Sequence, residues 1–156
     1  MKAGNPGMLI CHAAALVILC GAVITAFFKE EGSLEFSENQ TRGAFVSATG
    51  TYKPLGFDIR LDEFTIGQSE KMNWKGAVKG FRSRISVIDS GKVKLRDNIE
   101  VNRPLSYGGY TFYQSGYDPG RPGWTDLKVV KDPGAGTVFF GLALLNAGAL
   151  ITVLKK

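Results

Sequence analysis

Histidine and cysteine are scarce in this 156-residue chain, and their positions exclude several kinds of site. His12 is the only histidine, and it lies inside an apolar run, so a Ser-His-Asp triad or a histidine-rich metal cluster cannot form elsewhere. The two cysteines, Cys11 and Cys20, lie in the same run. Disulfide scaffolds, cysteine-based zinc sites and thiol redox centres are therefore excluded from the rest of the chain.

Nucleotide-binding glycine motifs and a convincing acidic cluster are also missing. The chain has neither G-x-x-x-x-G-K-[ST] nor a G-x-G-x-x-G that follows a strand. Asp58, Asp62 and Glu63 are close in sequence, but their alternation with apolar residues is typical of the exposed face of a strand. We therefore expect no self-contained catalytic site.

Charged residues are concentrated in the middle of the chain. Residues 29–134 contain all 14 acidic residues and 16 of the 19 basic residues, which leaves a net charge of +2. The other three bases are Lys2, Lys155 and Lys156, at the two ends. A pI near 9.3 would suggest nucleic-acid binding in a soluble domain. Because the excess charge flanks apolar runs, we interpret it as membrane-flanking charge and expect no nucleic-acid partner.

Two long uncharged runs, residues 8–28 and 135–154, are the clearest pattern in the sequence. At about 1.5 Å per residue, each would span roughly 30 Å as a helix, which is the thickness of a bilayer core. We predict two transmembrane helices that flank an extramembrane domain of residues 29–134. The positive-inside rule then places both termini in the cytoplasm of a bacterial inner membrane and the domain on the periplasmic or outer side.

The first run could instead be a cleaved signal. However, 21 apolar residues exceed a typical signal-peptide core, and no A-x-A site precedes Lys29. Cys20-Gly21 resembles a lipoprotein cleavage site, but Leu19 is large where such sites have a small residue. We favour an uncleaved anchor.

The residues between the two runs show the two-residue period of β-strands. Phe57, Ile59 and Leu61 alternate with polar residues, and Gly108-Gly109 would allow a bulge or a tight bend. Residues 70–79 have room for at most one helical turn. The pattern predicts a membrane-anchored, mainly β protein whose domain is a small antiparallel sandwich or a partly open barrel. The expected strand regions are residues 57–66, 81–88, 93–101, 107–117 and 124–131.

Two polar residues lie inside the apolar runs. His12 would lie near the cytoplasmic edge of the first helix, where an ionisable group usually faces protein, a cavity or a ligand. It could be a haem-iron ligand, or an interfacial histidine that bonds to a neighbouring helix. Asn146, near the middle of the second run, needs a partner across a helix interface, and Gly141 and Gly148 would allow close helix approach.

Five short segments form an ordered set: GFDIRLDEF (56–64), FRS (81–83), IEVNRP (99–104), LSYGGYTFYQSGY (105–117) and VVKDPG (129–134). This set resembles the ResB-like (CcsB-type) family of system II cytochrome c biogenesis proteins. The most specific part is NRPL at 102–105 followed by YQS at 113–115. The segment from His12 to Leu16 is similar to the family span just before its external domain.

The resemblance implies a role in cytochrome c maturation. Proteins of this type form a membrane complex with a ResC/CcsA-type partner that carries a tryptophan-rich haem-handling motif. The complex moves haem outward and joins it to apocytochrome c. The resemblance therefore implies apocytochrome c and the ResC/CcsA-type protein as partners, a transient haem shared with the partner, and His12 as a ligand of the haem iron.

The chain is a short form of this pattern. Family members usually have further spans and a larger external domain, and Trp74 and Trp124 are isolated rather than part of a tryptophan-rich motif. We therefore expect an accessory subunit, whose other spans come from a separate polypeptide, or a reduced paralogue with a changed role. The alternative function is a membrane scaffold or structural subunit of a redox complex with no haem contact.

We expect structural roles for the remaining motif residues. Pro104 fixes its own φ, and Asn102 can cap a turn. The tyrosines of residues 107–117 could form core and rim or offer a stacking surface. The Asp-Pro-Gly segment 132–134 would set the turn into the second helix. The full set of family-motif residues is Asn102, Pro104, Tyr107, Tyr113, Gln114, Asp132, Pro133 and Gly134.

Overall fold

The computed structural model describes residues 5–66 and 80–154, and the chain divides into two compact units. One unit is formed by the two ends of the chain, up to Lys29 and from Asp132 onwards. The other is formed by Glu30–Lys131. The helical turn considered for residues 70–79 lies outside the described residues.

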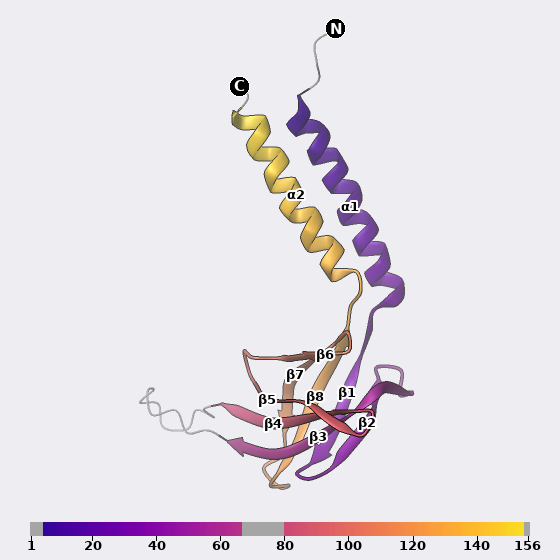
Figure 1. The fold of residues 1–156 in the computed structure, drawn as a ribbon, viewed down its shortest axis with the longest axis vertical. Helices are drawn as coiled ribbons and strands as arrows, with labels where there is room; N and C mark the ends of the chain where they lie inside the picture. Colours follow the sequence, from indigo (N-terminus) through magenta and orange to yellow (C-terminus); the bar gives the residue numbers. More distant parts are fainter. Residues whose placement is uncertain (1–4, 67–79, 155–156) are drawn as a thin grey trace, which may run out of the picture. The chain divides into compact units, whose positions relative to one another are not determined.

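The first unit is a pair of apolar helices, α1 (Pro6–Phe28) and α2 (Ala135–Leu154), which pack side by side (Figure 1). Asn5 caps α1: its side chain accepts a hydrogen bond from the backbone N–H of Gly7, and Pro6 occupies the first helical position. Both helices are long and apolar enough to cross a bilayer, in agreement with the two predicted runs.

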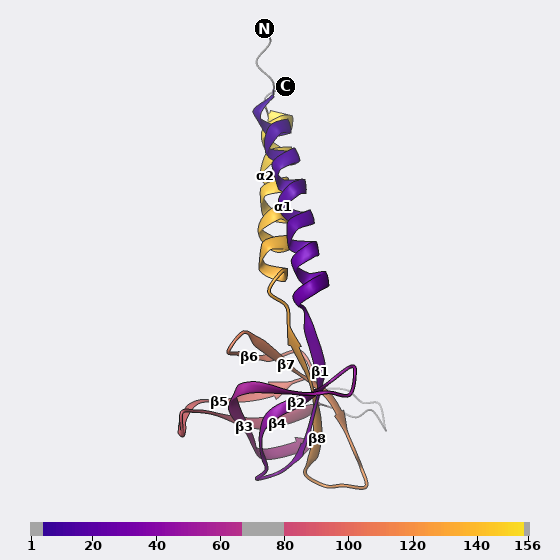
Figure 2. The ribbon, with the colours of Figure 1, turned by 90° about the vertical axis from the view of Figure 1, so that its right-hand side faces the viewer.

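The second unit is a single antiparallel β-sheet, whose strands are drawn in Figures 1 and 2. Its strands are β1 (Glu30–Ser37), β2 (Thr41–Ser47), β3 (Tyr52–Ile66), β4 (Phe81–Asp89), β5 (Lys92–Glu100), β6 (Leu105–Tyr107), β7 (Tyr110–Tyr117) and β8 (Trp124–Lys131). They pair in the order β5-β4-β3-β2-β1-β8-β7-β6. β1 pairs with β8 along its length, from Glu30–Lys131 to Ser37–Trp124, so both ends of the domain leave from neighbouring strands.

The sheet curls until its two ends share one hydrophobic core. Ile99 of β5 and Leu105 of β6 belong to the same buried cluster, although these strands lie at opposite ends of the pairing order. Side chains also bridge the gap between the ends, because Tyr107 of β6 donates a hydrogen bond to Asp89 of β4. The sheet is thus a nearly closed barrel, which confirms the prediction of a mainly β domain and decides for the partly open barrel over the sandwich.

Tight turns explain how adjacent strands are joined. β4 and β5, which cover two of the expected strand regions, form a hairpin whose two-residue turn has φ +52° at Ser90 and +72° at Gly91. β6 and β7 are joined by Gly108-Gly109, with φ +59° and +81°, so this pair makes a tight turn rather than a bulge. Positive φ at both central residues is typical of the hairpin turn whose twist matches that of the strands. β1 and β2 were not among the expected strands.

Candidate functional site

His12 lies on the exposed face of α1, turned away from α2. Its Nδ1 is 2.7 Å from the carbonyl oxygen of Met8, one helical turn earlier. A carbonyl can only accept, so Nδ1 carries the proton and Nε2 keeps its lone pair. This hydrogen bond also fixes the orientation of the ring, as such bonds do for metal-ligating histidines. Nε2 has no hydrogen-bond partner among the described residues. Its lone pair is therefore available to coordinate a metal ion.

The two helices pack through small residues, four glycines and one alanine, that recur every seven residues. On α1 the buried positions are Gly7, Ala14 and Gly21, and on α2 they are Gly141 and Gly148. A Cβ at Gly148 would lie 2.9 Å from Cys11 Sγ, and one at Gly141 would lie 2.6 Å from the side chain of Ile18. Gly141 and Gly148 are thus the close-approach residues of this helix pair. We call this contact the helix seam: residues 7, 14 and 21 of α1 against Gly141 and Gly148 of α2 and Gly134, which directly precedes α2.

Asn146 does not point into the helix seam. Its side chain is exposed in the helix pair, and its Nδ2 donates a 2.8 Å hydrogen bond to the carbonyl oxygen of Leu142 in its own helix. This bond uses one of the two N–H groups and leaves Oδ1 and the second N–H. An interface between Asn146 and a further helix therefore stays a prediction.

The Asp132-Pro133-Gly134 segment is the N-terminal cap of α2. One carboxylate oxygen of Asp132 accepts hydrogen bonds from the backbone N–H groups of Gly134 (3.0 Å) and Ala135 (3.1 Å). The same oxygen accepts one from the hydroxyl of Thr25 on α1, at 2.7 Å. A side chain at Gly134 would overlap the backbone of Gly21. The segment therefore starts α2 and ties it to the end of α1.

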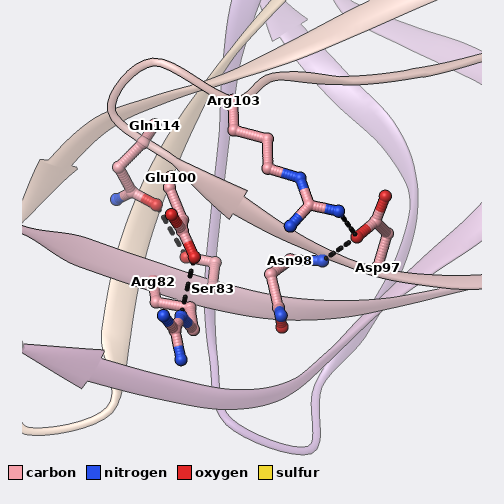
Figure 3. Close-up of polar contacts among 7 residues, drawn as sticks. All are labelled: Arg82, Ser83, Asp97, Asn98, Glu100, Arg103 and Gln114. Carbon is pink, nitrogen blue, oxygen red and sulfur yellow. Dashed lines mark hydrogen bonds and ion pairs between the residues drawn. The ribbon is translucent and has the colours of Figure 1, made fainter.

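Asn102 and Pro104 lie at an exposed turn between β5 and β6. Backbone hydrogen bonds of 3.0 Å run in both directions between Glu100 and Arg103, so Val101 and Asn102 form the tip. Val101 is 57% exposed. Figure 3 shows the ion pairs on either side of this turn, Arg82–Glu100 and Arg103–Asp97, each 2.8 Å long. A cleft of about 510 Å³ beside the turn is lined in part by Arg82, Glu100 and Arg103.

Gln114 is the centre of a buried polar network that joins β4, β7 and β8. Ser83 donates a 2.7 Å hydrogen bond to Oε1 of Gln114 (Figure 3), and the amide Nε2 of Gln114 donates a 2.7 Å bond to the hydroxyl of Thr125. Ser83 and Thr125 are both fully buried. Thr125 in turn donates to the carbonyl oxygen of Gly116. The network bridges the gap between the ends of the sheet.

The two motif tyrosines have different surroundings. Tyr107 packs edge-on against Phe57, with ring centroids 4.9 Å apart, and its hydroxyl donates to Asp89. Hydrogen bonds from Ser90 and then from Tyr107 hold the pKa of Asp89 below its ordinary value, and the bond to Asp89 raises the pKa of Tyr107. Tyr113 is 40% exposed on β7. Tyr107 thus belongs to the partly buried edge of the core, and Tyr113 to the surface.

Several residues of these sites were not predicted from the sequence. Ser83 and Thr125 complete the Gln114 network, and Thr25 completes the cap of α2. Sequence spacing could not have found them, because the partners are far apart in the chain. The seam residues Gly7 and Gly21 could have been found from the seven-residue spacing of small residues, which predicts a left-handed helix pair.

Comparison with known proteins assigns the chain to a family. The family model described as "ResB-like family" matches residues 2–123. The chain belongs to the ResB-like family. This confirms the resemblance carried by the five ordered segments.

Individual relatives support the same assignment. The chain is 34% identical to "Cytochrome c biogenesis protein CcsB" of Microcystis aeruginosa, over 73% of this chain and 26% of that protein. It is 35% identical to "Protein NrfI" of Wolinella succinogenes, over 65% and 11%. It is 31% identical to "Cytochrome c biogenesis protein CCS1, chloroplastic" of Arabidopsis thaliana, over 83% and 23%. The chain thus spans about a quarter or less of the length of these relatives.

A solved structure shares the fold of this ResB-like chain. The structure titled "Cytochrome c Heme Lyase CcmF" matches with a TM-score of 0.60 at 12% identity, over 94% of this chain and 24% of that chain. At this identity the match supports the fold alone.

Proposed function

We propose that this ResB-like chain is a membrane-anchored component of cytochrome c maturation, which helps to deliver haem to apocytochrome c together with a ResC/CcsA-type partner. The observation that carries the proposal is membership of a family whose similar relatives are named cytochrome c biogenesis proteins. The two apolar helices agree with a membrane location. The bacterial inner membrane, with both termini cytoplasmic and the β domain on the outer side, follows from the positive-inside rule as part of the proposal.

His12 is the residue of this chain that suits the haem cargo. A neutral imidazole nitrogen is a standard axial ligand of haem iron. The Met8 carbonyl holds the ring through Nδ1, so Nε2 faces outward with its lone pair available. One histidine supplies one ligand, and we assign any second ligand to the partner. His12 therefore acts as a holding residue for the cargo rather than as a catalyst.

Haem content of the purified complex tests this assignment. The full chain is expressed with an affinity-tagged ResC/CcsA-type protein, purified in detergent and assayed as the pyridine haemochrome. His12→Ala is expected to lower haem per complex at least fivefold. Leu16→Ala is the matched control, because Leu16 is also exposed and lies one turn further along α1. Its haem content should match that of the unmodified chain.

Two results would contradict the proposal in different ways. An unchanged haem content and absorption spectrum in His12→Ala would remove the ligand role. A stable complex that contains no haem, even with His12 present, would favour the scaffold function instead. The orientation has its own test: protease added to sealed spheroplasts should cut the β domain, and protection of the domain would reverse the proposed topology.

A further inference from the structure

A row of side chains crosses five strands on the outward-facing surface of the barrel. Residues that lie directly opposite each other in neighbouring antiparallel strands have their side chains on the same face. The pairing runs from Tyr113 of β7 to Lys128 of β8, Ser33 of β1, Val46 of β2 and Tyr52 of β3. Tyr52 is 77% exposed, Tyr113 40% and Val46 36%. At about 4.8 Å between strands, the row is roughly 19 Å long.

The barrel surface is hollowed along this row. One concavity, of about 760 Å³, has Ser33, Val46 and Tyr52 among its lining residues. A second, of about 320 Å³, has Ser33, Val46 and Lys128 among its own. Because the two concavities share Ser33 and Val46, they form one groove that follows the row. We call it the transverse groove, and it is lined by residues 31–35, 41–44, 46–48, 52, 115, 126 and 128.

The transverse groove carries two carboxylates that no basic side chain of the described residues neutralises. Glu35 of β1 lies directly opposite Asp126 of β8, so both side chains project from the same face. Asp126 accepts a hydrogen bond from the hydroxyl of Ser33. Arg42 donates to the backbone carbonyl oxygen of Glu35 rather than to its carboxylate. Like charges directly opposite each other destabilise a strand pair, so this pair of carboxylates weakens the barrel unless a cation binds between them.

The charge of the groove selects a cationic partner. Two neighbouring carboxylates attract lysine and arginine side chains, and they repel the propionates of haem, the phosphates of nucleic acids and anionic lipid headgroups. The lysine that lines the groove, Lys128, is already paired with Glu31 at 3.6 Å. The exposed rings of Tyr52 and Tyr113 offer apolar surface, and their faces also attract cations. The groove therefore suits a polypeptide with basic side chains.

An extended polypeptide also matches the length of the groove. At about 3.3 Å per residue, six extended residues span roughly 20 Å, which is close to the length of the row. We propose that the transverse groove binds an extended, lysine- or arginine-bearing segment of apocytochrome c, with the basic side chain between Glu35 and Asp126 and neighbouring apolar side chains against Tyr52 and Val46. The identity of this polypeptide rests on the proposed function, whereas its extended form and its charge are argued from the groove.

Binding of haem-free cytochrome c polypeptide to the purified full chain in detergent tests the role of the carboxylates. Fluorescence anisotropy of the labelled polypeptide gives the Kd. Glu35→Lys should raise the Kd at least tenfold, because it places a cation where the proposal needs an anion, and Glu35→Asp should stay within threefold of the unmodified chain. Glu63→Lys is the matched control, because Glu63 lies on β3 outside the groove, where it pairs with Arg84, and it should change the Kd less than twofold. An unchanged Kd in Glu35→Lys would overturn the proposal.

Photocross-linking in membranes tests the position of the bound segment. Benzoylphenylalanine is introduced into the full chain at position 46, in the middle of the groove, or at position 93 on β5. Val93 is the matched control, because it is 43% exposed and lies outside the groove. Cross-linking to co-expressed, tagged apocytochrome c is expected to be at least tenfold stronger from 46 than from 93. Equal yields, or cross-links from 46 to a second copy of this chain, would overturn the proposal.

Haem content separates the failure of this proposal from the failure of the proposed function. The groove lies in the barrel, and His12 lies in α1. If the purified complex contains haem but Glu35→Lys binds apocytochrome c as tightly as the unmodified chain, the groove assignment fails and the proposed function stands. If the complex contains no haem but Glu35→Lys still weakens binding at least tenfold, the groove assignment stands and haem delivery fails.

Discussion

Replacement of Gln114 by alanine should lower the stability of the barrel more than any other single substitution in its buried polar network. Gln114 accepts a hydrogen bond from the hydroxyl of Ser83 and donates one to the hydroxyl of Thr125, both at 2.7 Å. Neither hydroxyl has access to water, since both residues are 0% exposed. The substitution therefore removes two hydrogen bonds at once, at the place where β4 and β7 meet across the gap between the sheet ends.

The expected loss follows from the two buried groups. A buried polar group left without its partner costs about 1–3 kcal/mol. Thr125 keeps its bond to the Gly116 carbonyl, and Ser83 and Thr125 are 3.5 Å apart, so part of the loss is recovered. We therefore expect Gln114→Ala to lower the free energy of unfolding of the β domain by about 2–4 kcal/mol. For a domain of about 100 residues this corresponds to a drop in Tm of roughly 10–20 °C.

Thermal unfolding of the full chain in detergent, followed by near-UV circular dichroism, measures this change. Ser115→Ala is the matched control, because Ser115 is the next residue along β7 and is exposed; its effect should stay within about 0.5 kcal/mol. The double variant Ser83→Ala/Gln114→Leu should be less destabilised than the sum of its single variants, since it replaces both partners with apolar groups. A Tm for Gln114→Ala equal to that of Ser115→Ala would refute the assignment of the network as a stabilising bridge.

Two further predictions concern the cap of α2 and the edge of the barrel. Asp132→Ala should destabilise the start of α2 by about 0.5–2 kcal/mol and speed hydrogen exchange at the Gly134 amide, with Asp132→Asn as the milder control; unchanged exchange would contradict the cap. Because hydrogen bonds from Ser90 and Tyr107 lower the folded-state pKa of Asp89, this carboxylate stabilises the fold above its ordinary pKa, and the stabilisation is lost as pH falls through the lowered value. An NMR titration should therefore show a higher Asp89 pKa in Tyr107→Phe, and an unchanged value would exclude the bond.

The strands that sequence predicted are those whose burial follows their local pattern. In β4 the exposed Arg82 and Arg84 share one face and the buried Ile85 and Val87 the other, so a two-residue period is visible in the sequence, and only the burial of Ser86 departs from it. β1 was missed because it begins with two glutamates and a glycine, and only Leu34 and Phe36 are fully buried. It is held by pairing with β8 over its whole length. That pairing joins the first and last strands of the domain, and no local pattern reveals it.

The same distinction applies to the functional residues. His12 and Asn146 could be selected from sequence, because a polar group in a long apolar run is conspicuous whatever the fold. Their placement on the outer faces of the helix pair could not, since it depends on which positions form the helix seam. The seven-residue spacing of small residues on both helices could have predicted the helix seam. The sequence analysis selected only Gly141 and Gly148, which belong to α2.

The polar groups of the two units differ in a way that separates stability from partner binding. Within the part of the chain that the structure describes, no buried side-chain nitrogen or oxygen lacks a hydrogen-bond partner, and the Gln114 network shows how the barrel achieves this. The unused capacity of His12 and Asn146 lies instead on exposed helix surface. Changes in the barrel interior should therefore lower Tm, whereas changes at His12 or Asn146 should alter haem or partner content while the barrel keeps its Tm. If barrel variants and helix variants always lose stability and partner together, this division is wrong.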